Sequence, residues 1–326
     1  MSNDTFKEFK KNLPGIKNNI LLKKYTTFKI GGPAEYFLIV KKKENLIKAV
    51  KLAKKLKLPI FIFGGGSNLL VSDEGIRGLV VKIQNLDKKF KIRKLKSDVI
   101  IETSAGIELK DLVEFSIKKS LQGLEWSGGL PGTFGGAVRG NAGAFGGEIK
   151  DIIFEVEALD KNFNLKKLSK KQCQFSYRSS IFKKNDWIVL SVVIKLKKGN
   201  KKDIRSVAQY CIKYRRDRHP WEYPNAGSIF KNCAFSGFSS GFKKKLSKVV
   251  KQDPFPIVPT AYLISELGLK GTKIGNAQIS EKHPNFIVNL GGAKARDVLK
   301  LIDLVKQKVK KVYNIKLETE VQFVGF

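Results

Sequence analysis

The chain has 326 residues, and its 63 Lys and Arg outnumber 29 Asp and Glu, for a formal charge of +34 at pH 7. This length predicts two or three domains. No apolar run is long enough to span a membrane and no signal segment opens the chain. Its three cysteines lack the spacing of a disulfide framework or a zinc site. We expect a reduced, soluble, cytoplasmic protein without membrane insertion or metal.

The positive charge raises the possibility of a nucleic-acid-binding protein. Lysines outnumber the nine arginines, and they spread from Lys7 to Lys316 rather than gathering on one element. Base and bidentate phosphate recognition favour arginine, and no nucleic-acid motif is visible. The lysines are therefore interpreted as a solvated face whose field attracts small anions, and no specific nucleic acid is expected as a partner.

The first part of the chain predicts a strand–helix–strand unit that ends in glycines. Residues 1–18 are polar and predict a short helix or an arm. Residues 44–57 have apolar positions at helical spacing, residues 58–63 form a short apolar run, and Gly64, Gly65 and Gly66 follow. Such loops offer bare N–H groups to a pyrophosphate, although this spacing matches neither a Walker motif nor G-x-G-x-x-G.

The middle of the chain combines short strands with a second, denser glycine cluster. Short strands are predicted from residue 90, then a helix at 109–119, and strands at 152–159 and 187–195. Between them, residues 128–147 contain nine glycines. That density indicates positive φ angles or peptide N–H groups that face a ligand, and tight turns between short strands are the alternative.

Beyond a candidate linker at 199–202, the pattern becomes helical. Helices are predicted at 204–216, 260–267 and 295–312, and an apolar strand closes the chain at 321–326.

Seven blocks occur in an order that resembles the UDP-N-acetylenolpyruvoylglucosamine reductase family. They are T-F-K-I-G-G-P-A at 27–34, G-G-G-S-N-L-L at 64–70, P-G-T-F-G-G-A at 131–137, N-A-G-A-F-G at 141–146, S-Y-R-S-S at 176–180, N-A-G-S-I-F-K-N at 225–232 and L-E-T-E-V at 317–321. The resemblance extends from about residue 19 to residue 325.

The resemblance implies an α+β architecture in several parts. An N-terminal arm (1–18) would precede an FAD-binding domain of the vanillyl-alcohol-oxidase (PCMH) type (19–198). That domain would consist of two α/β subdomains, about 19–84 and 85–198. A C-terminal α/β substrate-binding domain (204–316) would follow, and a terminal strand (317–326) would bear Glu320.

The resemblance also implies the reaction: NADPH-dependent reduction of UDP-N-acetylglucosamine enolpyruvate to UDP-N-acetylmuramate for peptidoglycan. Hydride would pass from NADPH to FAD and then to the enolpyruvyl carbon. Arg178 would face the substrate, where its fork suits a carboxylate. Ser228 would protonate the adjacent carbon, and Glu320 would pair with Arg178 or the enolate end of the substrate. Without the resemblance, the sequence N-A-G-S predicts a turn or an N-cap, and Glu320 would be interpreted as a solvated residue at the edge of a strand.

Contacts to cofactor and substrate follow from the same blocks. Tyr177, Lys231 and Asn232 would contact the substrate, the last two at its pyrophosphate. Neither glycine cluster contains a histidine or cysteine that could tether a flavin, so FAD should be non-covalent. The residues that would hold FAD are Gly64, Gly65, Gly66, Ser67, Asn68, Gly132, Thr133, Gly135, Gly136, Asn141 and Gly143.

Two features refine the resemblance. Cys233 stands where the family usually has proline. Arg178 and Ser228 lie only fifty positions apart, which resembles the shorter subtype that lacks a tyrosine loop. An FAD-dependent oxidase of the same fold, acting on a small alcohol or hydroxy acid, is the alternative enzyme, but it has no need of the ordered Arg178, Ser228 and Glu320. The oligomeric state stays open, with a monomer expected.

Overall fold

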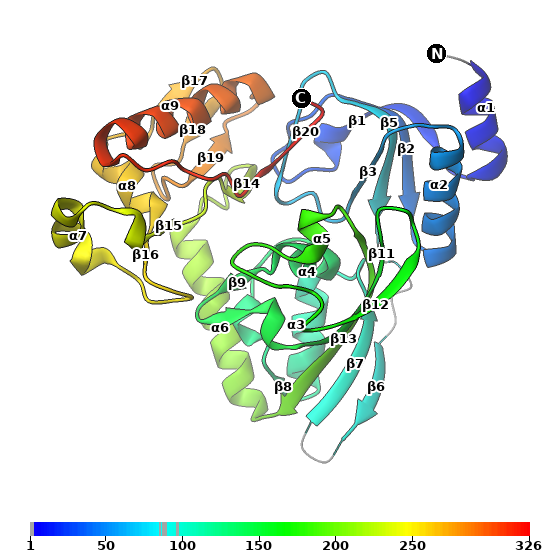
Figure 1. Cartoon of the computed structure of the whole chain (residues 1–326), viewed down its shortest axis with the longest axis horizontal. Helices are drawn as coiled ribbons and strands as arrows, with labels where there is room; N and C mark the ends of the chain where they lie inside the picture. The colour runs from blue at the N-terminus through cyan, green and yellow to red at the C-terminus, as the bar shows by residue number, and fades with distance from the viewer. Residues whose placement is uncertain (1–2, 85, 87–89, 96–97) are drawn as a thin grey trace. The chain divides into compact units, whose positions relative to one another are not determined.

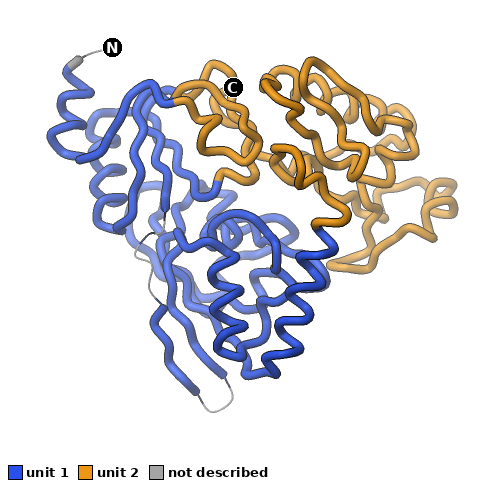
Figure 2. Tube along the Cα trace, turned by 180° about the vertical axis from the view of Figure 1, so that it is seen from behind, with its two compact units in different colours: residues 1–20, 34–65, 77–215 blue, residues 21–33, 66–76, 216–326 orange. Residues whose placement is uncertain are grey.

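The computed structural model describes residues 3–84, 86, 90–95 and 98–326, which form an α+β protein (Figure 1). The chain divides into two compact units, neither of them continuous in sequence (Figure 2). Unit 1 comprises residues 1–20, 34–65 and 77–215, and unit 2 comprises residues 21–33, 66–76 and 216–326.

The first sheet of unit 1 has the strand order β1-β2-β5-β3. Its strands are β1 (Lys17–Leu21), β2 (Pro33–Val40), β3 (Ile60–Phe63) and β5 (Ile76–Ile83), and β3 runs parallel to β5. Helices α1 (Asn3–Asn12) and α2 (Lys43–Lys55) lie beside this sheet (Figure 1). In α2 the buried residues Leu46, Ala49, Val50 and Ala53 recur at helical spacing, which confirms the predicted helix.

The second sheet of unit 1 is larger and antiparallel. Its order is β12-β11-β13-β7-β6, and β8 also pairs with β13. The strands are β6 (Phe90–Lys94), β7 (Asp98–Ser104), β8 (Leu121–Gln122), β11 (Ile153–Leu159), β12 (Leu165–Ser169) and β13 (Ile188–Lys198). Helix α3 (Leu109–Lys118) packs its Leu109 and Leu112 into the same core as Val156 and Val192. The predicted strands at 152–159 and 187–195 and the helix at 109–119 are thus confirmed.

The glycine-rich stretch contains a helix that the sequence did not predict. Helix α4 (Phe134–Gly140) begins after Thr133, whose Oγ1 accepts a hydrogen bond from the Gly136 amide at 3.4 Å. It ends at Asn141, which is left-handed with φ 44°. Glycines disfavour helices, but burial of Phe134 and Val138 together with the two caps outweighs that preference. Shorter elements complete this unit: η2 (Glu125–Ser127), β9 (Gly143–Ala144), β10 (Gly147–Glu148), η3 (Ile149–Asp151) and α5 (Ile181–Lys184).

Helix α6 (Lys201–Arg218) begins inside the candidate linker at 199–202, and its residues up to Arg215 belong to unit 1. We expected the helix at 204–216 to open a C-terminal domain. Instead Ala208 joins the core of the large sheet, and the buried Arg215 guanidinium donates hydrogen bonds to the carbonyl oxygens of Trp126 and Gly128. A buried arginine held by backbone acceptors anchors the helix to this unit.

Unit 2 contains a four-stranded sheet in the order β14-β19-β18-β17, whose strands are β14 (Asn225–Ser228), β17 (Lys273–Ile274), β18 (Ala277–Ile279) and β19 (Phe286–Asn289). Helix α9 (Ala295–Tyr313) packs over this sheet (Figure 1), with a buried stripe that includes Val298, Ile302 and Val305. Two small ladders complete the unit, β15 (Cys233–Ala234) with β16 (Ile257–Val258) and β4 (Leu69–Val71) with β20 (Gln322–Val324). Its remaining helical elements are η1 (Leu22–Lys24), η4 (Phe235–Gly237), α7 (Ser240–Leu246), η5 (Ser247–Val249) and α8 (Thr260–Glu266). The predicted helices at 260–267 and 295–312 are confirmed.

Within the described ranges, no helix is both long and apolar enough to cross a membrane.

Candidate active site

Residues 64–65 and 132–133, from the two glycine loops, contact each other within unit 1. A Cβ added to Gly64 would lie 2.1 Å from Thr133 Oγ1, and one added to Gly65 would lie 2.6 Å from the Cα of Gly132. Both distances are far below van der Waals contact. The glycines at 64 and 65 are therefore required first by the neighbouring loop, in addition to any requirement of a ligand.

The contact between the loops leaves two amide groups for an anion. Among the described residues, the N–H groups of Gly65 and Gly132 have no hydrogen-bond acceptor. The Lys82 ammonium donates to the carbonyl oxygen of the adjoining Gly64 at 2.7 Å. Burial lowers the pKa of Lys82, and the charge of Glu108 opposes that shift. Bare amides beside a lysine suit a diphosphate, so these residues fit the FAD that the sequence predicts.

Residues Gly66, Ser67 and Asn68, which continue the first loop, belong to unit 2. Gly66 has φ 64°, and a Cβ there would lie 2.4 Å from the carbonyl oxygen of Tyr25. The Asn68 side chain donates to the backbone carbonyl oxygen of Glu320 at 3.1 Å. Thus Asn68, predicted as a cofactor contact, also fixes the segment that bears Glu320.

Arg178 lies in a tight turn of unit 1. Ser176 and Ser179 exchange two backbone hydrogen bonds of 3.0 Å, and Arg178 between them is left-handed with φ 54°. Its Nη2 donates to the Gly143 carbonyl oxygen at 2.7 Å, and its guanidinium lies 5.0 Å from the centroid of the Tyr177 ring. A non-glycine residue with positive φ is uncommon and often marks a functional position.

Asn141 connects this turn to the glycine-rich stretch. Its buried side chain donates to the Ser176 carbonyl oxygen at 3.0 Å and to Glu148 Oε2 at 3.3 Å, and its Oδ1 accepts from the Lys150 amide at 3.0 Å. Asn141 and Gly143, both predicted to hold FAD, thus each form a hydrogen bond with the arginine turn, in addition to contacts with Glu148. Gly135 contacts Ala105 in the same way that Gly65 contacts Gly132, because a Cβ there would lie 2.5 Å from Ala105 Cβ.

Sequence reasoning missed Glu148. This carboxylate is 6% exposed, and its Oε1 is enclosed without a hydrogen-bond partner among the described residues. The sequence signal is an acidic residue that ends the glycine run in F-G-G-E-I. Lys82 was missed as well, because one lysine among many carries no signal.

Ser228 ends strand β14 in unit 2, where it pairs with Phe286 of β19. The preceding Gly227 has φ 78°, and its amide donates to the Asn225 side chain at 2.9 Å. The next residue, Ile229, accepts a hydrogen bond of 2.8 Å from the amide of Glu320. Unit 2 therefore brings the backbones that carry Ser228 and Glu320 side by side.

The predicted substrate contacts Lys231 and Asn232 lie on the same segment. Lys231 Nζ pairs with Glu318 Oε2 at 2.8 Å, and Asn232 Oδ1 accepts from the Thr260 amide at 3.2 Å. Cys233 Sγ lies 3.5 Å from Thr260 Oγ1. Burial raises the pKa of the Cys233 thiol, which disfavours the reactive thiolate.

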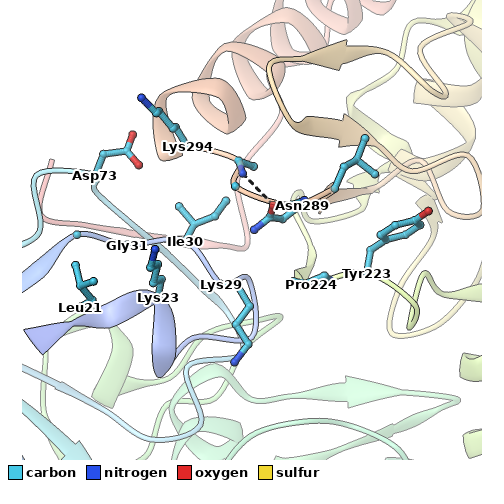
Figure 3. A pocket seen from close by; sticks show the side chains of 15 residues that line it. Leu21, Lys23, Lys29, Ile30, Gly31, Asp73, Tyr223, Pro224, Asn289 and Lys294 are labelled. Atoms are coloured by element: carbon cyan, nitrogen blue, oxygen red, sulfur yellow. Dashed lines mark hydrogen bonds between the residues drawn. The ribbon is translucent and has the colours of Figure 1, made fainter.

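A cavity of about 550 Å³ also lies within unit 2 (Figure 3). Its lining includes Lys23, Lys29 and Asn289, and none of the predicted site residues. Asn289 holds the lining together, because its Nδ2 donates to the Phe28 carbonyl oxygen and its Oδ1 accepts from the amides of Gly291 and Ala293.

Models of known protein families match both the N-terminal and the C-terminal part of the chain. Residues 34–169 match an "FAD binding domain" model, and residues 219–324 match the model of the "UDP-N-acetylenolpyruvoylglucosamine reductase, C-terminal domain". The first match confirms the predicted α+β fold with an FAD-binding domain.

Similar proteins carry one common name. The chain is 40% identical to the UDP-N-acetylenolpyruvoylglucosamine reductase of Clostridium novyi, with 95% of this chain and 92% of that protein covered. It is 41% identical to that of Syntrophomonas wolfei, with 95% of each covered. The crystal structure of the Thermus caldophilus reductase aligns with a TM-score of 0.73 at 32% identity, over 95% of this chain and 98% of that one. This chain therefore belongs to the UDP-N-acetylenolpyruvoylglucosamine reductase family.

Proposed function

We propose that this protein reduces UDP-N-acetylglucosamine enolpyruvate to UDP-N-acetylmuramate in peptidoglycan synthesis, with FAD as cofactor and NADPH as reductant. The observation that carries this function is the family match, which spans the FAD-binding part and the C-terminal domain in one chain. The reaction is carried out by an FAD-dependent oxidoreductase. We further propose a monomer in the cytoplasm, with no nucleic acid as its specific partner.

FAD is proposed to bind non-covalently at the two glycine loops. The bare amides of Gly65 and Gly132 and the ammonium of Lys82 support this assignment. When bound, FAD supplies a two-electron carrier that takes hydride from NADPH and gives it to the substrate. The further residues proposed to contact it are Gly64, Gly66, Ser67, Asn68, Thr133, Gly135, Gly136, Asn141 and Gly143.

Arg178 is proposed to bind the substrate carboxylate, with Tyr177 beside it. Hydride addition to an enol ether next to a carboxylate builds negative charge on that carboxylate. A guanidinium stays charged at every working pH and offers a fork of donors. The hydrogen bond to Gly143 and the ring of Tyr177 support this role, because they hold the guanidinium in one orientation.

Ser228 is proposed to deliver the proton to the adjacent carbon, with Glu320 acting on the enolate end of the substrate or on Arg178. A serine hydroxyl is a weak acid, so a neighbouring cation or amide must stabilise the alkoxide that forms. The hydrogen bond from Glu320 to Ile229 supports a joint role for the two segments.

Lys231 and Asn232 are proposed to contact the pyrophosphate of the UDP group. Lys231 is already paired with an exposed glutamate, so an anionic ligand would compete with Glu318 for it. Residues 19–198 are proposed to serve FAD binding, and the residues that follow helix α6, up to residue 316, substrate binding. The spacing of Arg178 and Ser228 favours the subtype without a tyrosine loop.

Product analysis tests this function. Purified protein is incubated with NADPH and either the enolpyruvyl sugar or UDP-N-acetylglucosamine, which lacks the reducible group. We expect one NADPH to be consumed per UDP-N-acetylmuramate formed with the first compound, and no oxidation above background with the second. Equal NADPH oxidation with both compounds would refute the proposed substrate.

A further inference from the structure

Glu148 and Arg178 flank the same backbone position in unit 1. A Cβ built on Gly143 would lie 2.8 Å from Glu148 Cγ and 3.2 Å from Arg178 Nη1. Only a glycine at 143 leaves room for both side chains. The carbonyl oxygen of the same glycine accepts the 2.7 Å hydrogen bond from Arg178 Nη2. The side chains of Glu148 and Arg178 therefore both pack against Gly143.

The carboxylate of Glu148 is held in place by its surroundings. Oε2 accepts from Asn141 Nδ2 and pairs with the Lys150 ammonium. Asn141 also donates to the carbonyl oxygen of Ser176, at the base of the arginine turn. The Asn141 side chain thus links Glu148, through hydrogen bonds, to the turn that carries Arg178.

The second carboxylate oxygen of Glu148, Oε1, is not held in this way. Glu148 Oε1 is enclosed and has no hydrogen-bond partner in the described part of the chain. A buried carboxylate oxygen without a partner is costly, and a capping role in η3 needs only one oxygen. Its side chain and the Arg178 guanidinium, whose proposed ligand is itself an anion, lie against the same glycine.

Resting on the role proposed above for Arg178, we propose that Glu148 is a positioning residue that acts through Arg178. Its buried negative charge keeps the guanidinium at the Gly143 carbonyl in the orientation that receives the substrate carboxylate. The charge does not touch the substrate, and Glu148 takes no part in hydride or proton transfer.

The test is a double-mutant cycle read by equilibrium binding to the FAD-loaded protein without NADPH. Wild type, Glu148→Gln, Arg178→Ala and the double variant are titrated with the enolpyruvyl sugar and with UDP-N-acetylglucosamine, which lacks the carboxylate. Glu148→Gln keeps the shape and removes the charge. We expect about a tenfold weaker Kd for the enolpyruvyl sugar and an unchanged Kd for UDP-N-acetylglucosamine. In the Arg178→Ala background, Glu148→Gln should have no further effect.

Glu157 provides a matched control. It is also a largely buried glutamate in unit 1 that pairs with one lysine, with a side-chain exposure of 13% against 8% for Glu148. Glu157→Gln should leave both dissociation constants unchanged, and all variants should bind FAD normally.

The outcomes separate this inference from the proposed function. Equal weakening of both ligands, additive effects of Glu148→Gln and Arg178→Ala, or no effect of Glu148→Gln would overturn the positioning role while the Arg178 assignment stands. If Arg178→Ala alone binds the enolpyruvyl sugar as tightly as wild type, the Arg178 assignment is wrong and the positioning role fails with it.

Discussion

The Cα of Gly132 lies only 2.6 Å from the position that a Cβ on Gly65 would occupy. Gly65 and Gly132 of the two loops therefore lie too close together for a side chain on Gly65 to fit between them. From the sequence alone, such glycines are explained by a ligand whose close approach a Cβ would block. The structure adds a second reason, which is that each loop excludes side chains from the other.

Gly65→Ala should lower both flavin content and the stability of the FAD-free protein. The added Cβ must displace backbone at residue 132, because no flexible side chain is there to move. Overpacking of this kind costs typically about 1–3 kcal/mol. Thermal unfolding of the flavin-free protein measures it. Gly140→Ala is the control, because a Cβ there meets nothing within 4 Å and alanine favours helix α4. Unchanged apo stability in Gly65→Ala would show that the loops yield easily.

Arg178→Ala should weaken binding of the enolpyruvyl sugar and leave flavin reduction by NADPH near the wild-type rate. A hydrogen bond to a charged group contributes about 2 kcal/mol, which corresponds to roughly a thirtyfold weaker Kd. Titration calorimetry and stopped-flow absorbance measure the two quantities separately. Slower flavin reduction with unchanged sugar binding would place Arg178 at the NADPH step instead.

Ser228→Ala should affect only the second half-reaction. Loss of a positioned general acid slows the dependent step by about 10²–10⁴, or roughly 3–5 kcal/mol of transition-state stabilisation. Substrate binding should change little, because the hydroxyl contributes mainly in the transition state. Flavin reoxidation by the sugar, followed in D₂O with analysis of product stereochemistry, measures this. Near-normal turnover with one retained configuration would mean that another group supplies the proton.

The burial of His283 leads us to predict that the protein loses stability in mild acid. Burial lowers the pKa of His283 to about 4 from 6.5, so this histidine is neutral in the folded state. Between these two values the unfolded chain binds the additional proton, and stability therefore falls as pH drops from about 6.5 to 4. The loss reaches at most about 3 kcal/mol. Urea unfolding at pH 7 and pH 4.5 should show a smaller decrease for His283→Gln than for wild type, and parallel decreases would exclude this histidine as the cause.

The sequence predicted the elements whose apolar periodicity matches their burial. Helix α9 is the clearest example, because its buried stripe of Val298, Ile302 and Val305 is legible without any structure. Helix α4 was not predictable in the same way. Its glycines argue against a helix, and the two caps together with the burial of Phe134 and Val138 reverse that preference.

The residues of the candidate site likewise differ in whether the sequence alone could predict them. Motif order indicated Arg178, Ser228 and Glu320, whose roles stay predictions. Glu148 ends the glycine run in F-G-G-E-I, but what distinguishes it is an enclosed carboxylate oxygen on a side chain that packs against Gly143, and only the structure shows this. Likewise, the clash that a side chain on Gly65 would cause depends on a loop that lies 67 positions away in the chain.

The central claim is that one bound flavin connects NADPH to the enolpyruvyl sugar, and anaerobic stopped-flow spectroscopy of the wild-type protein tests it most directly. The flavin absorbance is bleached by one equivalent of NADPH, and the reduced enzyme is then mixed with either the enolpyruvyl sugar or oxygen. We predict that the sugar restores the oxidised spectrum faster than oxygen does and yields UDP-N-acetylmuramate. Rapid reoxidation by oxygen together with no reaction with the sugar would contradict the account and indicate an oxidase of the same fold.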